Sequence, residues 1–205
     1  MGKMISHLAS NQGISITSLV DCDVCIDFSH ADCLFDHLKL AAKHQKALVI
    51  GTTGWNDRLD EVLAFIKEHQ MGVLASPNFS IGVHLFTKIL ENAAKMVSPF
   101  QEYEVAGVEL HHSKKVDAPS GTALALSHTI DSHFSREKKC TFSSVRVGSV
   151  PGEHTLFFDS PFDTITITHT ARNREGFAQG ALFAARFLMG KKGFYTFKDC
   201  MREQP

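Results

Sequence analysis

The chain has 205 residues, of which 43% are hydrophobic and 21% charged, and its formal net charge is −1. These values are typical of a globular protein and exclude extensive disorder, and the balanced charge gives no reason to expect nucleic acid or an anionic membrane as a partner. No apolar run is long enough to cross a bilayer, and the first residues lack the apolar stretch of a secretory signal, so we expect a cytoplasmic protein.

The first half of the chain alternates short apolar runs with helical patterns. Strands are predicted at residues 24–28, 47–51 and 72–76, and helices at 31–43, from an N-cap at Asn56 onward, and at 80–97. The run at 47–51 is continuously apolar, as strands buried on both faces tend to be. Strands that alternate with helices in this way predict a parallel sheet with crossover helices, which is a Rossmann-like α/β arrangement.

The second half has a different pattern. A predicted strand at 104–112 and a helix at 120–134 are followed by three closely spaced strands at 141–148, 154–159 and 163–170, and then by a helix at 175–189. We therefore predict an α+β domain at 80–180, with an open mixed or antiparallel sheet and helices on one face. The Rossmann-like domain would take residues 1–79, and the chain would return to it near 180–205.

The densest group of polar residues is the segment ELHHSKKVDAPSGTA at 109–123, between a predicted strand and a predicted helix. His111, His112, Lys114 and Lys115 place two titratable rings and two cations within five residues. Adjacent side chains on a strand point to opposite faces, so at most one of the two histidines need be functional. A histidine can transfer protons near pH 7 and a lysine can act as a general acid, which makes this segment a candidate active site. The alternative interpretation is a solvated, basic turn.

The same segment runs into a predicted helix N-terminus. Pro119 restricts the backbone and Ser120 is a good N-cap, which should leave the backbone N–H groups of Gly121 and Thr122 free. Free N–H groups at the positive end of a helix bind anions, so we expect a carboxylate or phosphate ligand here.

Two loops follow strands of the predicted parallel sheet directly, at residues 51–54 (Gly-Thr-Thr-Gly) and 76–79 (Ser-Pro-Asn-Phe). Ligands of open α/β sheets bind outside the carboxyl ends of the strands. Two such loops at equivalent strand ends predict a ligand crevice. In the second half, His154 and His169 lie on predicted strands whose faces could close over one site.

Five cysteines are present, an odd number that argues against a disulfide framework. Cys22 and Cys25 have CxxC spacing, which zinc sites and redox sites share. We place both at the start of a strand, where side chains three residues apart point to opposite faces, so the two sulfur atoms should not converge.

Together these segments resemble the 4-hydroxy-tetrahydrodipicolinate reductase (dihydrodipicolinate reductase) family. Residues 109–123 are similar to its signature, and further patterns of the family occur in order at 24–29, 51–54, 78–82, 146–148, 152–154 and 177–181. The resemblance covers the chain from about residue 20 to its C-terminus. It implies an oxidoreductase of lysine and diaminopimelate biosynthesis that reduces a cyclic dicarboxylate with NADH or NADPH. It also implies a cytoplasmic enzyme, usually a homotetramer, that needs no metal.

The resemblance further implies roles for individual residues. By match to the motif, His111 is the active-site histidine and Lys115 the proton donor, while His112, Gly121 and Thr122 hold the substrate carboxylates. The residues implied to contact the coenzyme are Gly51, Thr52, Thr53, Ser76, Pro77, Asn78, Phe79 and Arg174.

The N-terminus departs from the family pattern. The family begins with a strand and a loop of the form G-x-x-G-[RK]-M-G that seats the coenzyme pyrophosphate, whereas this chain begins MGKMI, similar to the last residues of that loop. We expect the first strand and its glycines to be missing, which would leave a buried gap in the sheet. Residues 14–19 either are not a strand of this sheet or belong to an abbreviated domain, because only 20–23 separate them from the next strand.

Two hypotheses follow from this departure. In the first, the chain is a reductase whose sequence starts too late or is a fragment. In the second, it is a truncated, cofactor-poor remnant that acts as a dicarboxylate-binding or assembly module.

Overall fold

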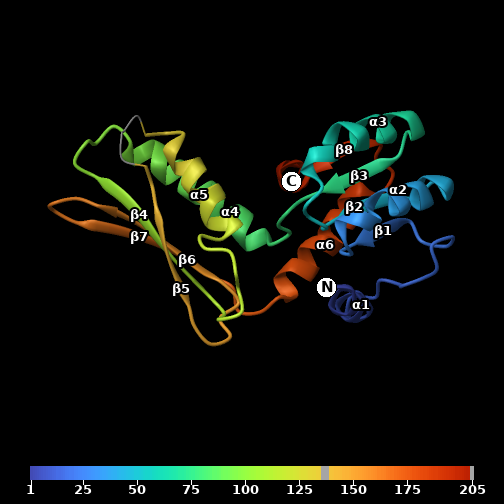
Figure 1. Cartoon of the computed structure of the whole chain (residues 1–205), viewed down its shortest axis with the longest axis horizontal. Helices are drawn as coiled ribbons and strands as arrows, with labels where there is room; N and C mark the ends of the chain where they lie inside the picture. Colours follow the sequence, from blue (N-terminus) through green and yellow to red (C-terminus); the bar gives the residue numbers. More distant parts are fainter. Residues whose placement is uncertain (135–138, 204–205) are drawn as a thin grey trace. The chain divides into compact units, whose positions relative to one another are not determined.

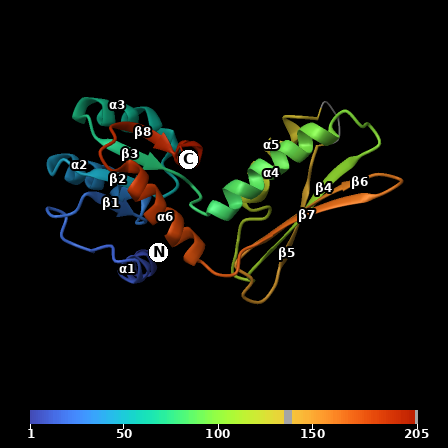
Figure 2. The same cartoon turned by 180° about the vertical axis from the view of Figure 1, so that it is seen from behind.

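The computed structural model describes residues 1–134 and 139–203, which form two compact units (Figures 1 and 2). Unit 1 comprises Met1–Ile81 and the segment from Glu175 onward, and unit 2 comprises Gly82–Arg174. The chain therefore leaves unit 1 at the start of one helix and re-enters it at the start of another.

Unit 1 is built on a four-stranded parallel sheet. Its strands are, in spatial order, β1 (Val24–Asp27), β2 (Ala47–Ile50), β3 (Gly72–Ala75) and β8 (Gly193–Thr196). The three strands predicted in the first half are confirmed, and the fold is Rossmann-like as expected. The sequence pattern missed β8, because four residues with a glycine and a threonine at the ends carry little periodic signal.

Helices cover both faces of this sheet. The lower face in Figure 1 carries α1 (Gly2–Asn11) and α6 (Glu175–Leu188), and the upper face carries α2 (Leu34–Lys43) and α3 (Leu59–His69). Side chains alternate along β2: Val49 packs into the core with α1 and α6, while Leu48 and Ile50 pack into the core with α2 and α3. A final helix, α7 (Phe197–Arg202), starts at a capping box in which Thr196 and Asp199 bond reciprocally.

Short 3₁₀ turns precede two of the predicted helices, so these helices begin later than the sequence predicts. The helix predicted from residue 31 begins with η1 (Ala31–Cys33), and α3 is preceded by η2 (Asn56–Arg58). Asn56 is the first residue of η2 and not a side-chain N-cap, since Trp55 occupies the cap position and no side chain accepts a cap hydrogen bond there. The Trp55 indole instead donates to the Thr52 carbonyl at 2.7 Å, which lets this turn form against the core.

Residues 14–19 are not a strand, which decides between the two interpretations of this segment. Strand β1 pairs with β2 on one side, and within residues 1–134 and 139–203 no strand pairs with its other edge. A cavity of about 490 Å³ lies there, lined by the start of α1, by residues 15–17 with Leu19, and by β1 and the residues after it.

Unit 2 holds a mixed four-stranded sheet, as one form of the prediction stated. Its strands are, in spatial order, β5 (Phe142–Arg146), β4 (Glu104–His111), β6 (Glu153–Asp159) and β7 (Thr164–Thr170). Strands β4 and β5 are parallel, and the other two pairs are antiparallel. Helices α4 (Ile81–Val97) and α5 (Gly121–Asp131) share one hydrophobic core with this sheet.

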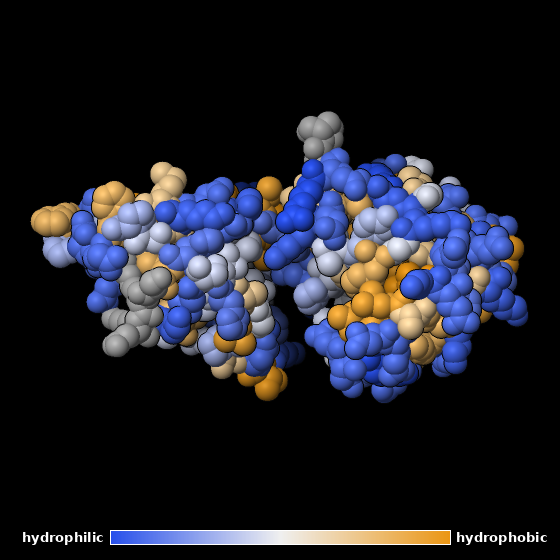
Figure 3. Space-filling view, turned by 90° about the horizontal axis from the view of Figure 1, so that it is seen from above, coloured by the Kyte–Doolittle hydropathy of each residue, from blue (hydrophilic) through white to orange (hydrophobic). Residues whose placement is uncertain are grey.

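Figure 3 shows a mostly hydrophilic face in both units, with one hydrophobic patch on unit 1. Among the described helices, none combines the length and the apolar character that spanning a membrane would require.

Gly180 of α6 is predicted to be one of the least replaceable residues of unit 1. A Cβ atom at this position would lie 1.7 Å from the Phe79 carbonyl oxygen, which is backbone and cannot rotate away. Gly180→Ala should therefore push α6 from the sheet and lower the free energy of unfolding by about 2 to 3 kcal/mol, the upper range for overpacking. Chemical denaturation followed by circular dichroism measures this.

Gly176 provides the matched control on the same helix. A Cβ there would meet no atom within 4 Å, so Gly176→Ala should be neutral or slightly stabilising. Equal stability of the two variants would contradict the close approach of α6 to Phe79.

Candidate functional site

The helix-covered face of the unit 2 sheet changes from apolar to polar along its strands. Gly107 of β4 is flanked across the sheet by the apolar residues Phe142, Leu156 and Ile167. Two residues further along β4, the facing residues are Ser144, Glu109, His154 and His169. The polar segment predicted as a site therefore begins inside the sheet, where four strands each contribute a polar side chain.

His111 ends β4 and lies at the centre of this polar region. Its side chain is buried, its Nδ1 atom is 3.3 Å from Glu109 Oε2, and its ring lies 5.2 Å from the ring of His154. The pairing of β4 with β5 places Arg146 opposite His111. The expected proximity of His154 to the site is thus confirmed. Burial lowers the pKa of His111 below its usual value, and the negative charge of Glu109 opposes that shift.

Glu109 is the residue that the sequence interpretation left without a role. It is completely buried, and its Oε1 atom accepts hydrogen bonds from the Ser120 backbone N–H at 2.9 Å, Ser144 Oγ at 2.7 Å and Arg146 Nη2 at 2.8 Å. Burial raises the pKa of this carboxyl, but the three donors outweigh it and hold the pKa at about 2. The signal was available: residues i and i+2 of a strand share a face, and Glu109 is two residues before His111.

Glu109, His111 and His154 each offer one ligand atom within 4.8 Å of the others, a set that could hold a metal ion. The Arg146 guanidinium already neutralises Glu109, and Lys115 adds a further positive charge near His111. This positive surrounding disfavours a cation and suits an anionic ligand.

The loop between β4 and α5 is closed by its own ion pair. Lys115 Nζ lies 2.7 Å from Asp117 Oδ1, and the Lys115 ammonium, with a smaller contribution from the Gly121 backbone N–H, lowers the pKa of the Asp117 carboxyl. The anion site expected at the backbone N–H groups of Gly121 and Thr122 stays a prediction, and the Asp117 carboxylate is a negative group that already lies near this helix N-terminus. The N-cap at Ser120 is confirmed, since its Oγ accepts the Ala123 N–H at 3.1 Å.

The remaining residues assigned to the substrate lie around this loop. His112 is half-buried and its carbonyl accepts the Lys115 N–H at 3.0 Å, while Thr122 is half-buried in the first turn of α5. Lys114 is exposed. Arg174, which lies after the last strand of unit 2 and which the resemblance assigns to the coenzyme, is exposed and directly precedes α6.

In unit 1 the two predicted loops lie at the same end of the sheet, because β1, β2 and β3 run parallel. Gly51 follows β2 in tight contact with Phe28: a Cβ atom at Gly51 would lie 2.1 Å from that ring. Thr52 is buried, and among the described residues its Oγ1 has no hydrogen-bond partner. Thr53 is exposed. At this end of β2 the Phe28 ring therefore fills the space beside Gly51, while the neighbouring Thr52 hydroxyl is left unsatisfied.

The loop after β3 is held by short-range hydrogen bonds. Ser76 Oγ donates to the Asn78 carbonyl at 2.6 Å, and Asn78 Oδ1 accepts the Ser80 N–H at 2.8 Å, while Pro77 is exposed. Phe79 is 1% exposed and packs edge-on against Phe28 and Phe197, so its ring belongs to the core and offers no surface to a ligand.

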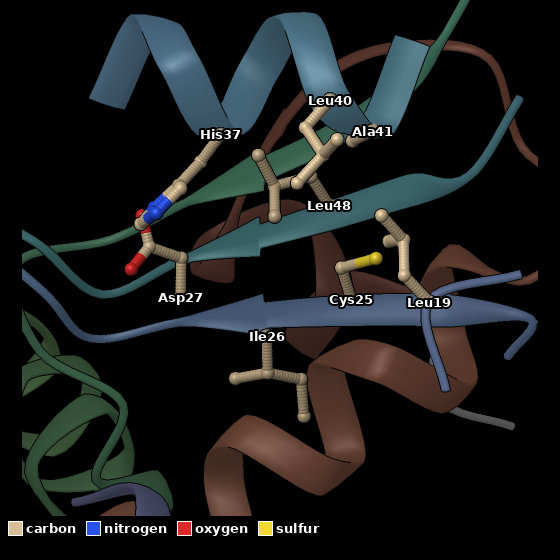
Figure 4. Close-up of a pocket in the computed structure, with 8 residues that line it drawn as sticks. All are labelled: Leu19, Cys25, Ile26, Asp27, His37, Leu40, Ala41 and Leu48. Atoms are coloured by element: carbon tan, nitrogen blue, oxygen red, sulfur yellow. The ribbon is translucent and has the colours of Figure 1, made fainter. Parts of the chain in front are cut away.

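A buried carboxylate stands at the end of β1. Asp27 accepts the Ser29 N–H at 2.8 Å and pairs with His37 Nδ1 at 3.0 Å, above a cavity of about 210 Å³ between β1 and α2 (Figure 4). Burial raises the pKa of Asp27, but its bonds to Ser29 and His37 outweigh this and lower it. Asp27 therefore stays ionised at this strand end.

The prediction that the sulfur atoms of Cys22 and Cys25 diverge is wrong. Their Sγ atoms are 3.6 Å apart, because Cys22 lies in the turn before β1, where strand alternation does not apply, and only Cys25 lies on the strand. Both thiols are free. Burial and the Cys22 sulfur raise the pKa of Cys25 to about 12, so this thiol is a poor nucleophile at neutral pH.

Comparison with known proteins connects both units to one family. The family models described as dihydrodipicolinate reductase, N-terminus and dihydrodipicolinate reductase, C-terminus match residues 1–79 and 82–201. A 4-hydroxy-tetrahydrodipicolinate reductase of Thermosipho africanus is 38% identical over 213 residues, which cover 99% of this chain and 94% of the relative. A protein of the same name from Archaeoglobus fulgidus is 39% identical over 201 residues, covering 89% of this chain and 77% of the relative.

Solved structures show the same fold. Dihydrodipicolinate reductase from Paenisporosarcina sp. TG-14, in a dipicolinate-bound form, matches with a TM-score of 0.67 at 24% identity, over 94% of this chain and 75% of that protein. A probable dehydrogenase from Thermotoga maritima matches with a TM-score of 0.57 at 8% identity, over 98% and 82% of the two chains.

Proposed function

Because the chain belongs to the dihydrodipicolinate reductase family, we propose that it reduces 4-hydroxy-tetrahydrodipicolinate to tetrahydrodipicolinate, a step of lysine and diaminopimelate biosynthesis. One observation carries the proposal: His111, Lys115 and the N-terminus of α5 meet around the loop between β4 and α5. A histidine, a cation and a helix N-terminus suit a small cyclic dicarboxylate that takes up a proton during reduction. The dipicolinate named for the Paenisporosarcina enzyme is a ligand of this class.

Residues at the carboxyl ends of β1 to β3 fit a dinucleotide. The unsatisfied Thr52 hydroxyl at the end of β2 is a feature that a bound coenzyme would use. We assign the nicotinamide side of the coenzyme to the residues around this hydroxyl and after β3, namely Gly51, Thr52, Thr53, Ser76, Pro77, Asn78 and the backbone of Phe79, with Arg174 as a further contact. When bound, NADH or NADPH supplies the hydride.

The chain's own residues then bind the substrate and supply the proton. Gly121 and Thr122 at the start of α5, together with His112, take the substrate carboxylates, one of which replaces Asp117 at the helix N-terminus. That exchange frees the Lys115 ammonium from its ion pair and leaves it beside the substrate. Lys115 donates the proton that completes reduction, and the buried imidazole of His111 forms the opposite side of this reacting region.

We extend the proposal to assembly and location. The sheet face of unit 2 that turns away from α4 and α5 carries the partly exposed apolar side chains of Val145 and Phe157. Such a face suits a homotetramer assembled through these sheets. We place the enzyme in the cytoplasm because it would act in a biosynthetic pathway. Sedimentation analysis of the purified chain measures the subunit number.

Two measurements on the purified chain test the function. In the first, the synthase of the preceding pathway step produces the substrate in the assay mixture, and the absorbance of NADH or NADPH is followed. The second titrates the chain with each coenzyme and with 2,6-pyridinedicarboxylate, an aromatic mimic of the substrate.

Substrate-dependent oxidation of either coenzyme is the expected result. Binding of 2,6-pyridinedicarboxylate without oxidation of either coenzyme would overturn the reductase and support the dicarboxylate-binding module instead. Absence of both activities would contradict both functions.

A further inference from the structure

We propose that Glu109 is a positioning residue for His111: its Oε2 atom accepts the Nδ1–H of the imidazole, which leaves Nε2 as the nitrogen that meets the substrate. This assignment rests on the proposed function for its catalytic meaning, but the hydrogen-bonding state of His111 can be tested without any activity.

The orientation of the Glu109 carboxylate is set by the three donors on Oε1. Two of them, the Ser144 hydroxyl and the Arg146 guanidinium, come from β5, and the third is the N–H of Ser120 before α5, so the carboxylate cannot rotate without losing all three. Oε2 is thereby directed at two imidazoles, with His111 Nδ1 at 3.3 Å and His154 Nε2 at 3.6 Å. Glu109 is 0% exposed, so water does not compete for this atom.

Glu109 Oε2 and His111 Nδ1 are both buried and, among the described residues, neither makes a hydrogen bond, although the two atoms are only 3.3 Å apart. A small rotation of the imidazole would align an Nδ1–H with Oε2. An ionised carboxylate only accepts hydrogen bonds, and a neutral imidazole carries its proton on one nitrogen. A lone pair on Nδ1 would face the carboxylate and repel it, whereas an N–H there satisfies two buried polar atoms at once. His154 is further from Oε2, and its Nε2 also meets Ser120 Oγ at 3.3 Å. The geometry therefore favours the Nδ1–H form of His111.

The other ring nitrogen is kept accessible by a glycine. A Cβ atom at Gly152 would lie 3.0 Å from His111 Nε2, closer than almost any side chain comes. The absence of a side chain at Gly152 leaves that side of the ring clear. Nε2 is consequently the atom through which His111 can accept a proton or a hydrogen bond from a ligand.

The charge of Glu109 has a second consequence for His111. Burial and the positive charges of Lys115 and Arg146 lower the pKa of His111, and Glu109 is the strongest group that acts in the other direction. Asp117 also raises the pKa of His111, and the ring of His154 packs against the His111 ring. A permanently ionised Glu109 thus keeps a buried imidazole able to take up a proton.

The direct test is the tautomer of His111 in the unaltered chain. Long-range ¹H–¹⁵N spectra distinguish the two neutral forms, and His111→Asn identifies the signal. We expect Nδ1–H for His111 at a pH where it is neutral. The Nε2–H form would overturn the proposal, and this outcome is independent of whether the chain reduces any substrate.

The kinetic test uses Glu109→Gln. The amide oxygen of the new glutamine can accept the three hydrogen bonds that Glu109 Oε1 accepts. Its NH₂ group would then face His111 Nδ1, so the imidazole proton would have to move to Nε2. We expect kcat to fall about a hundredfold, the scale of one acid–base group, with KM little changed. The limb of the pH profile that reports His111 should move to lower pH. Glu109→Asp, which retains the charge, should move that limb back toward its original position.

Glu104→Gln is the matched control, since Glu104 lies on the same strand and is exposed. It should leave kcat and the pH profile unchanged. If Glu109→Gln lowers stability but leaves kcat per folded molecule and the pH profile as they were, Glu109 has only a structural role and the proposal fails.

Discussion

Replacing Lys115 or His111 by alanine is expected to lower kcat/KM at least about a hundredfold, the usual scale for a group that transfers or directs a proton. Lys115 is the cation of the loop between β4 and α5, and its present partner is Asp117, whose carboxylate also lies at the N-terminus of α5. His111 is the buried ring beside that loop. Steady-state kinetics with both variants and either coenzyme measure the effect.

Two further lysine variants separate the possible reasons for such a loss. Lys114→Ala is the matched control, because Lys114 is adjacent and exposed, and its rate should stay close to that of the unaltered chain. Lys115→Arg keeps the positive charge but cannot give up a proton, so KM should be retained while kcat falls. Near-normal rates for both alanine variants would refute the assigned roles.

The second large effect is a loss of stability in mild acid. His154 is buried, and burial together with nearby positive groups lowers its pKa from 6.5 to about 4. The unfolded chain therefore takes up a proton at this residue over a pH range in which the folded chain does not. Stability is fully present above pH 6.5 and declines as the pH falls toward 4, by about 3 kcal/mol for this residue. Denaturant unfolding at a series of pH values measures the decline.

His154→Gln should flatten that decline, because glutamine does not titrate. The slope is best compared above pH 4.5, since at lower pH the unfolded chain also begins to protonate Glu109, whose folded pKa is about 2. His128→Gln, on an exposed position of α5, should keep the slope of the unaltered chain. Identical slopes for all three proteins would show that His154 is not held neutral by the fold.

The strands of unit 1 could be predicted because they are buried on both faces. A continuous apolar run as short as 47–51 favours a buried strand over a buried helix, because helices need about ten residues or more. β8 could not be predicted, because its place in the sheet depends on backbone pairing with β3, which begins more than a hundred residues earlier in the sequence. Local periodicity contains no information about such a partner.

The candidate site also combines features that the sequence predicts with features that only the fold determines. The segment at 109–123 identified His111 and Lys115 from residue types and order, and Ser120 was predicted correctly as a cap because capping depends on neighbours in sequence. Three features required the fold. Glu109 gains its partners from β5 and from the residue before α5, Asp117 pairs with Lys115, and the Cys22 sulfur lies 3.6 Å from that of Cys25.

Sequence alone was sufficient for the fold class, the order of most elements and the family, because these depend on local composition, periodicity and a long uninterrupted motif. Only the tertiary structure decided which nitrogen of His111 faces a carboxylate and which carboxylate pairs with Lys115. The physical reason is that hydrogen bonds and charges act over a few ångströms in space. The register of β4, β5 and β6 brings those groups within that range from residues that lie up to 45 positions apart, as Glu109 and His154 do.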